Sequence, residues 1–244
     1  MCKGAITSAV LSAILLAASA MTAGCHDEEI SPPSHLGVMG ASMSFGYQGW
    51  PVSDALHAAL PDAKITSLAD VFFYQDPVGN AQAQAATMAQ TKAELVVALD
   101  YLFWLGYSSG SPQTTIEYGL TALEALDDGT RMLVIGDIPQ LDAGVGYVLS
   151  DSQIEAIHAR LMAWAAQRRN IAIVPFSQWS ALLRSDAAVT LPDGVNVPAR
   201  SLMNDDALHP TALGTWFILD RVDELLPALL PRYGADFVQF TRPQ

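Results

Sequence analysis

The sequence predicts an α/β fold, a three-layer α/β/α sandwich on a parallel sheet of about five strands. Short apolar runs that do not alternate with polar residues are typical of strands buried on both faces, and segments with helical spacing separate these runs along the chain. The 244 residues, 51% of them apolar, suffice for one domain with a well-buried core. A second large domain is not expected.

The expected elements alternate along the chain. Strands are expected where short apolar runs stand between turn signals, at residues 36–39, 64–67, 94–99, 131–136 and 171–176. Helices are expected where apolar residues recur every three or four positions, at residues 52–60, 81–92, 115–126, 152–169 and 211–230. Ser152-Gln153-Ile154-Glu155 matches a capping box and predicts the start of the fourth helix. Residues 190–197 are expected to form a small excursion around an Asp-Gly turn.

The first 24 residues have the pattern of an export signal. Lys3 precedes an Ala-rich apolar stretch, residues 5–20, which is too short for a typical membrane span. Thr22-Ala23-Gly24-Cys25 resembles the lipobox of bacterial lipoproteins, which implies lipidation of Cys25; cleavage without lipid remains the alternative, because Thr22 replaces a large aliphatic residue. We therefore expect a signal peptide at 1–24, a polar tether at 25–35 and one domain at 36–244. The expected location is the bacterial cell envelope, with the protein anchored as a lipoprotein or otherwise secreted.

Charge and composition exclude several classes of partner. Twelve Lys and Arg against 25 Asp and Glu give a formal net charge of −13 without a basic cluster, so nucleic acid is not an expected partner. The two cysteines, Cys2 and Cys25, leave no intradomain disulfide after the expected cleavage. No histidine or cysteine cluster has metal-ligand spacing, and no glycine motif has dinucleotide-binding spacing, so neither a metal nor a cofactor is expected.

Two short motifs near opposite ends of the chain carry the predicted chemistry. Gly40-Ala41-Ser42 follows the first expected strand, and Asp206-Ala207-Leu208-His209-Pro210 precedes the last expected helix. A serine at a strand-to-helix turn becomes a nucleophile when a base takes its proton, and an Asp three residues before a His supplies both the base and the group that orients it. The pair predicts a serine hydrolase.

Three strand ends should contribute to one crevice. Ser42, Ala69 and Asp100 follow the first, second and third expected strands, and ligands of parallel sheets bind beyond the carboxyl ends of the strands. Four aromatic residues beside Asp100 could wall a pocket there: Tyr101, Phe103, Trp104 and Tyr107. A structural interpretation remains open for the distal motif, in which Asp205 or Asp206 caps the last helix and His209 is a loop residue.

At these residues the chain resembles the SGNH/GDSL hydrolase family of esterases and lipases. Residues 38–46 are similar to the family's first block, with Ala41 in place of Asp, and residues 206–211 match its last block closely. By element order the resemblance covers residues 36–230. It implies a flavodoxin-like fold, Ser42 as nucleophile, His209 as base and then acid, and Asp206 as the group that orients the imidazole. Ser44 and Asp205 are the nearby competitors.

The resemblance also implies an oxyanion hole, formed in the family by the serine N–H, a glycine N–H and an asparagine side chain. Ala69 and Asp100 stand at the last two places here. An ionised carboxylate only accepts hydrogen bonds and would repel an oxyanion. Asp100 is therefore expected to be protonated, to bind a hydroxyl or cationic part of the substrate, or to leave the site weak. The structural alternative is that it caps residues 101–104.

The sequence thus predicts a serine esterase of SGNH type that hydrolyses a carboxylic ester, of an acyl or carbohydrate kind, through an acyl-enzyme. Its expected partners are a small-molecule or carbohydrate ester and the membrane, through a lipid on Cys25. Two alternatives remain open: a catalytically weak or inactive accessory lipoprotein on the same fold, and an acyltransferase.

Overall fold

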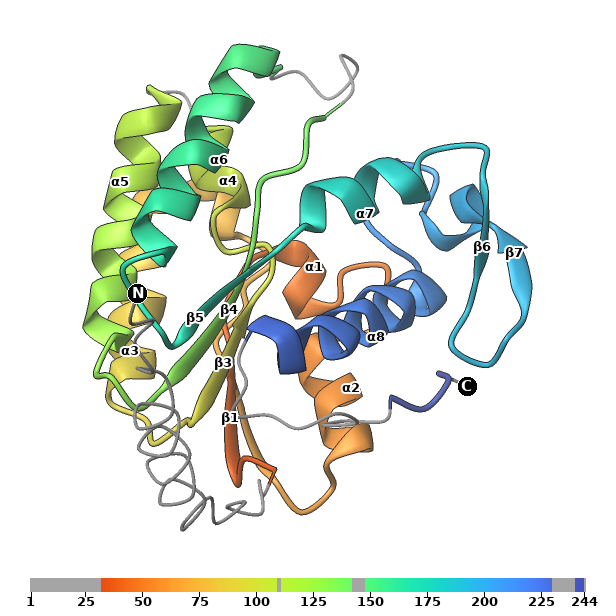
Figure 1. Cartoon of the computed structure of the whole chain (residues 1–244), viewed down its shortest axis with the longest axis horizontal. Coiled ribbons are helices and arrows are strands. Elements are labelled where there is room, and N and C mark those ends of the chain that lie inside the picture. The colour runs from red at the N-terminus through yellow and green to blue at the C-terminus, as the bar shows by residue number, and fades with distance from the viewer. Residues whose placement is uncertain (1–31, 109–110, 142–147, 230–239, 244) are drawn as a thin grey trace, which may run out of the picture. The chain divides into compact units, whose positions relative to one another are not determined.

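The centre of the molecule is a sheet of five parallel strands in the order β2-β1-β3-β4-β5 (Figure 1). The strands are β1 (His35–Val38), β2 (Lys64–Ser67), β3 (Leu95–Ala98), β4 (Met132–Gly136) and β5 (Ile171–Val174). The computed structural model describes residues 32–108, 111–141, 148–229 and 240–243. Its five strands confirm the predicted α/β class and parallel sheet.

Burial explains why these runs form strands. β1, β3 and β4 are buried along their whole length, whereas the edge strand β2 is only partly covered. In the register, Val38 of β1 lies opposite Ser67 of β2 and Val97 of β3. The carboxyl ends of these three strands therefore meet at one edge, where the residues that follow them can share a site.

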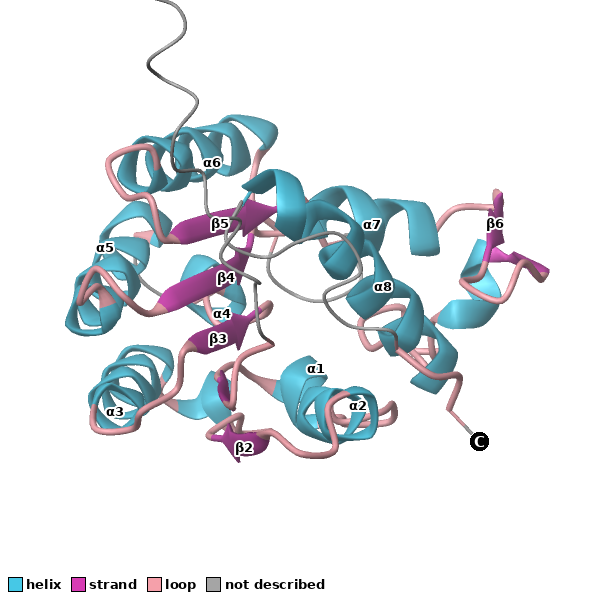
Figure 2. Ribbon diagram, turned by 60° about the horizontal axis from the view of Figure 1, so that its bottom comes forward, coloured by secondary structure: helices cyan, strands magenta, loops and turns pink. Residues whose placement is uncertain are grey.

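Helices cover both faces of the sheet, as Figure 2 shows. One face carries α3 (Pro77–Ala89), α5 (Pro112–Leu123) and α6 (Asp151–Ala165); the other carries α2 (Val52–Ala59), α7 (Phe176–Leu183) and α8 (Ala212–Leu229). Each layer has its own buried apolar cluster against the strands. Two short helices, α1 (Ser42–Phe45) and α4 (Phe103–Gly106), follow the carboxyl ends of β1 and β3.

The remaining elements are small. The described residues include the 3-10 turns η2 (Phe73–Gln75), η3 (Glu124–Leu126) and η5 (Ala199–Leu202). The expected excursion around the Asp-Gly turn is an antiparallel hairpin of β6 (Ala188–Thr190) and β7 (Asn196–Pro198). Gly194 has a φ of +83° in its turn, a backbone conformation that glycine adopts without strain. No helix in the described part of the chain combines the length and apolar character that a membrane crossing requires.

Two local predictions were wrong. The capping box of α6 uses Ser150 and Gln153 instead of Ser152 and Glu155: the Gln153 N–H donates to Ser150 Oγ, and the Ser150 N–H donates to Gln153 Oε1.

The segment after β5 was predicted to continue as a strand to residue 176 but forms α7. Pro175 lacks an N–H and ends the strand, and the Asp137 carboxylate then accepts hydrogen bonds from the Ser177 N–H and hydroxyl.

The start of the domain also differs from the prediction. His35, which was assigned to the tether, is the first residue of β1 and is buried. Its Nε2 lies 2.9 Å from Thr66 Oγ1 in the neighbouring strand, and Ser34 donates its N–H and hydroxyl to the Glu94 carboxylate. These bonds draw the residues before Leu36 into the sheet. The predicted signal peptide, Cys25 and the tether up to residue 31 lie outside the described residues.

Gly40, which follows β1, tests how tightly the turn is packed. Its φ is +143°, and a Cβ there would collide with Asp100 Oδ1 and approach Ser44 Oγ to 2.7 Å. We expect Gly40→Ala to lower the free energy of unfolding by about 3 kcal/mol or more, since backbone strain and a steric clash combine. Urea unfolding measures this loss. Gly129→Ala is the matched control, because Gly129 has a φ of +77° but no atom within 4 Å of the added carbon. Equal losses in both variants would contradict the packing explanation.

Candidate active site

The structure brings the three residues of the two motifs together at the carboxyl edge of the sheet. Ser42 is the first residue of α1, and its Oγ lies 2.8 Å from His209 Nε2. The other imidazole nitrogen, Nδ1, lies 2.7 Å from Asp206 Oδ2. Ser42 and His209 are 167 residues apart in the chain, so this contact is made by the fold alone. The result is a continuous hydrogen-bonded chain from carboxylate to imidazole to hydroxyl.

Asp206 is held as an orienting carboxylate. Its Oδ1 accepts hydrogen bonds from the backbone N–H groups of Leu208 and His209, both at 2.9 Å. Burial opposes ionisation of Asp206, but these bonds and the His209 imidazole outweigh it and hold the pKa of Asp206 below its usual value. A carboxylate that accepts from Nδ1–H leaves Nε2 with a lone pair toward Ser42. No hydrogen bond or ion pair joins the competitor Asp205 to His209 among the described residues.

The hydroxyl of the other competitor, Ser44, is bonded to Asp100. Its side chain is fully buried, and its hydroxyl donates to Asp100 Oδ1 at 2.5 Å. No hydrogen bond joins His209 to Ser44 among the described residues. The geometry therefore favours Ser42 over Ser44 as the nucleophile.

Asp100 has other contacts than those the sequence analysis expected. Its carboxylate accepts from the backbone N–H groups of Ala41 (3.0 Å), Met43 (2.9 Å) and Ser44 (3.2 Å), in addition to the Ser44 hydroxyl. Every one of these contacts goes to the turn that carries Ser42. The structural alternative, in which Asp100 caps residues 101–104, is wrong, because its side chain caps α1 instead. Asp100 also lines the pocket beside Ser42, and its predicted oxyanion or substrate role stays a prediction.

Burial and hydrogen bonding shift the pKa of the Asp100 carboxyl group in opposite directions. Asp100 is 4% exposed, and desolvation raises its pKa, while the hydrogen bonds from Ser44, Ala41 and Met43 work against the rise. Both carboxylate oxygens already accept two hydrogen bonds each. Asp100 is therefore suited to fixing the backbone around Ser42.

Gln84, which the sequence analysis missed, holds the same turn from α3. Its Oε1 accepts from the Gly40 N–H and its Nε2 donates to the Gly40 carbonyl, both at 2.9 Å. The side chain is buried at 7% exposure. Its only sequence signal was a position on the inward face of an Ala-rich helix, among three glutamines of similar appearance. The turn is thus fixed from two sides, by Asp100 and by Gln84.

Asn204, also missed, joins the two halves of the site. Its Nδ2 lies 3.1 Å from three carbonyl oxygens, those of Gln48, His209 and Pro210. The first belongs to the loop after α1 and the other two to the loop that carries the imidazole. The Tyr47 ring packs edge-on against His209, with 4.9 Å between ring centroids. These contacts restrict the imidazole to the face of Ser42.

Two backbone N–H groups that follow β1 and β2 have no acceptor among the described residues. The Ala41, Met43 and Ser44 N–H groups are taken by Asp100, whereas the Ser42 N–H has no acceptor among the described residues. The same holds for the N–H of Ala69, which follows β2. The Asp70 N–H donates to the Gly40 carbonyl at 3.1 Å, which places this segment against the turn. Ser42 and Ala69 are therefore candidate donors to an oxyanion.

A pocket opens next to the Ser42 hydroxyl. Its cavity volume is about 20 Å³, close to the space that one water molecule needs. The lining is mostly apolar and contains no side-chain amide: Ser42, Met43, Asp100, Phe103, Pro139, Leu141, Phe176, Ser180, Ala207, Leu208 and His209. This pocket, the acyl pocket below, is suited to a small apolar group.

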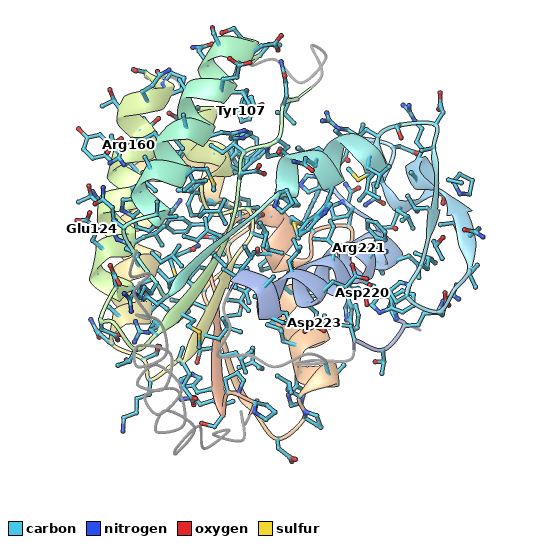
Figure 3. All side chains as sticks on the ribbon, viewed as in Figure 1. Tyr107, Glu124, Arg160, Asp220, Arg221 and Asp223 are labelled. Atoms are coloured by element: carbon cyan, nitrogen blue, oxygen red, sulfur yellow. The ribbon has the colours of Figure 1, made fainter. Side chains whose placement is uncertain are left out.

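The four aromatic residues near Asp100 have different positions. Phe103 lines the acyl pocket, whereas Tyr101 is fully buried and donates its hydroxyl to the Ala81 carbonyl. The hydroxyl of Tyr107, which is labelled in Figure 3, donates to the Pro139 carbonyl and accepts from the Leu141 N–H. Tyr107 therefore fixes the backbone of two residues that line the pocket. Trp104 packs against Phe103 without lining the pocket. Of the expected aromatic wall, only Phe103 faces the site directly.

The described residues contain no group of three or more His, Cys, Asp or Glu side chains arranged to hold a metal ion.

Comparison with known proteins gives the fold a context. No family model matches the sequence, and no curated protein matches it either. Solved structures do match. A protein assigned to the G-D-S-L family of lipolytic proteins, from Desulfitobacterium hafniense DCB-2, superposes with a TM-score of 0.52 at 13% identity, over 78% of this chain and 97% of that one. The lipase/acylhydrolase from Enterococcus faecalis superposes with a TM-score of 0.50 at 14% identity, over 86% and 99%. The chain therefore has an SGNH-like fold, in common with lipolytic proteins and acylhydrolases that are distant in sequence.

Proposed function

We propose that this protein is a serine esterase that hydrolyses a carboxylic ester through an acyl-enzyme. The observation that carries the proposal is the hydrogen-bonded chain Asp206–His209–Ser42, with 2.7 Å and 2.8 Å between the bonded atoms. A nucleophile, a base within hydrogen-bond reach and a group that orients the base are the arrangement that acyl transfer by serine requires.

The reaction follows from the positions of these groups. His209 Nε2 takes the proton as Ser42 Oγ attacks the ester carbonyl, and Asp206 stabilises the imidazolium that forms. The tetrahedral oxyanion is stabilised by the N–H groups of Ser42 and Ala69. His209 then gives its proton to the departing alcohol, which leaves an acyl group on Ser42. Water, activated by the same imidazole, attacks this acyl group, and the carboxylic acid leaves.

The acyl pocket limits the acyl group. A cavity of about 20 Å³ with walls such as Phe103, Leu141 and Phe176 accepts a short apolar chain more readily than a long one. We therefore propose acetyl or a similarly short acyl group.

The place given to asparagine in the SGNH/GDSL resemblance is occupied by Asp100, and we propose that Asp100 is a positioning residue. It fixes the turn while leaving the Ser42 N–H free for the oxyanion. Without a side-chain amide in the pocket, the oxyanion depends on backbone donors, and one such donor is worth about 3 kcal/mol in well-studied enzymes. A modest turnover number is the expected consequence.

The signal-like residues 1–24 and the lipobox-like residues 22–25 indicate where the protein is located. We propose that the chain is exported and anchored by a lipid on Cys25, with the domain held at the cell envelope by the short polar tether.

The esterase proposal is tested with p-nitrophenyl esters from acetate to octanoate and the purified protein. We expect hydrolysis that is fastest for acetate, and a fall of at least about a thousandfold in Ser42→Ala and in His209→Ala, because the nucleophile and base act as a unit. His57→Ala, on the exposed face of α2, is the matched control. A fluorophosphonate should label Ser42, as read by peptide mass; labelling of another residue would refute the assignment.

The positioning role of Asp100 is tested by Asp100→Asn. The variant keeps the shape of the side chain but replaces one accepting oxygen by an NH₂ group, which faces backbone N–H donors of the turn. We expect a loss of about 1–3 kcal/mol in the free energy of unfolding, because buried donors lose their acceptor. The kcat of the folded protein should fall with little change in KM. Asp76→Asn is the control, since Asn also caps a helix well and Asp76 caps α3. A gain in rate would instead show that the carboxylate hinders the oxyanion.

The anchor is tested by expression in a bacterial host. The mature chain should begin at Cys25, carry the mass of the lipid and partition into detergent, whereas Cys25→Ser should partition into water. Cys2→Ser serves as the control, because Cys2 lies within the signal. A mature chain that is cleaved but carries no lipid would support plain secretion.

A further inference from the structure

A second cavity lies beside the candidate active site. Its volume is about 170 Å³, and it is lined by Arg184, Arg200, Met203, Asn204, Asp205 and Ala207. Ala207 belongs to both cavities, because it also lines the acyl pocket. α7 runs along both as well: Ser180 lines the acyl pocket, and Arg184 follows it four residues later at the end of the helix. The second cavity is therefore an extension of the site.

The cationic lining is unusual for this chain, which has a formal net charge of −13. Most other described arginines are matched to carboxylates: ion pairs are formed by Arg131, Arg160, Arg168, Arg221 and Arg242. Arg200 differs. Its guanidinium donates to the Arg184 carbonyl at 3.5 Å and makes no ion pair with a described carboxylate, and the residue is exposed. A guanidinium left with unused donors at a cavity is suited to binding an anionic oxygen group.

The neighbouring groups favour the same ligand. Arg184 is anchored through hydrogen bonds to the carbonyls of Ser180 and Gln140, which keep its charge beside the cavity. The Asn204 amide is already bonded to carbonyl oxygens of the two site loops. Asp205 is the one acidic residue of the lining, against two arginines. The Arg200 guanidinium is thus the group of this lining that keeps donors for a bound anion.

The mechanism indicates which part of the substrate reaches this cavity. His209 must give its proton to the departing alcohol, so the alcohol lies beside the loop 206–209. Ala207 of that loop lines the second cavity, while the acyl group is assigned to the apolar pocket. We propose that the second cavity binds an anionic oxygen group, a carboxylate, sulfate or phosphate, carried by the alcohol part of the ester. This inference rests on the proposed esterase function and narrows its substrate class.

The test compares two esters that differ only in charge, 3-acetoxybenzoate and 3-acetoxybenzamide. We expect the full-length protein to prefer the charged ester in kcat/KM, and the preference to fall about tenfold in Arg200→Gln, as for a lost charge-assisted hydrogen bond. Asp205→Asn should raise the preference, because it removes a like charge. Added salt should lower it. Arg169→Gln makes the same charge change at the opposite, amino-terminal end of β5 and should leave the preference intact.

A binding measurement separates this inference from the esterase proposal. Calorimetry compares 3-hydroxybenzoate with 3-hydroxybenzamide on the parent and on Arg200→Gln. If both esters are hydrolysed without preference, or the preference survives Arg200→Gln, the anion site is refuted and the esterase stands. If neither ester is hydrolysed, but the parent binds 3-hydroxybenzoate and Arg200→Gln does not, the anion site stands and the esterase proposal fails. Absence of both hydrolysis and binding would overturn both.

Discussion

The buried carboxylate of Asp100 is the interaction on which the candidate site depends. It gathers three backbone N–H groups and one hydroxyl from four consecutive residues, Ala41 to Ser44, and so decides the path of the chain between β1 and α1. The carboxylate does not accept a hydrogen bond from the Ser42 N–H. The backbone N–H that stays unbound in these four residues is therefore that of the nucleophile. The same close approach explains Gly40, where any side chain would meet the carboxylate. A single buried carboxyl group thus holds the turn of the nucleophile and leaves the Ser42 N–H available to an oxyanion.

The second half of the site is built from hydrogen bonds within its own loop. Asp206 holds the loop through two backbone N–H groups and the imidazole, and Asn204 ties the loop to the backbone beyond α1. Both loops begin or end at elements packed on the sheet, β1 and α8. The 2.8 Å contact between Ser42 and His209 therefore depends on two rigid supports that meet only in the folded chain.

The two cavities beside Ser42, His209 and Asp206 differ in size and in the charge of their linings. The acyl pocket is small and apolar, whereas the cavity beyond Ala207 is larger and cationic. In a chain with a formal net charge of −13, the general field repels anions, and the Arg200 guanidinium places a positive charge at this cavity. A preference for esters of anionic alcohols would then come from the position of the arginines. It would need no change in the chemistry at Ser42.

The sequence by itself determined the sheet and the two motifs. Short continuous apolar runs such as 132–135, bounded by turn signals, favour buried strands, and their alternation with helices favours a parallel sheet. The Gly-x-Ser and Asp-x-x-His spacings are local, so Ser42, Asp206 and His209 could be named in advance. α7 was missed, although Phe176, Trp179 and Leu183 recur at helical spacing, because the apolar run before Phe176 was read as continuing the strand. Its first turn is held by Asp137, which follows β4. Tertiary structure alone decided the direction of the Asp100 carboxylate and the tasks of Gln84 and Asn204. The physical reason is that a polar side chain has no set function until the fold determines which donors and acceptors surround it.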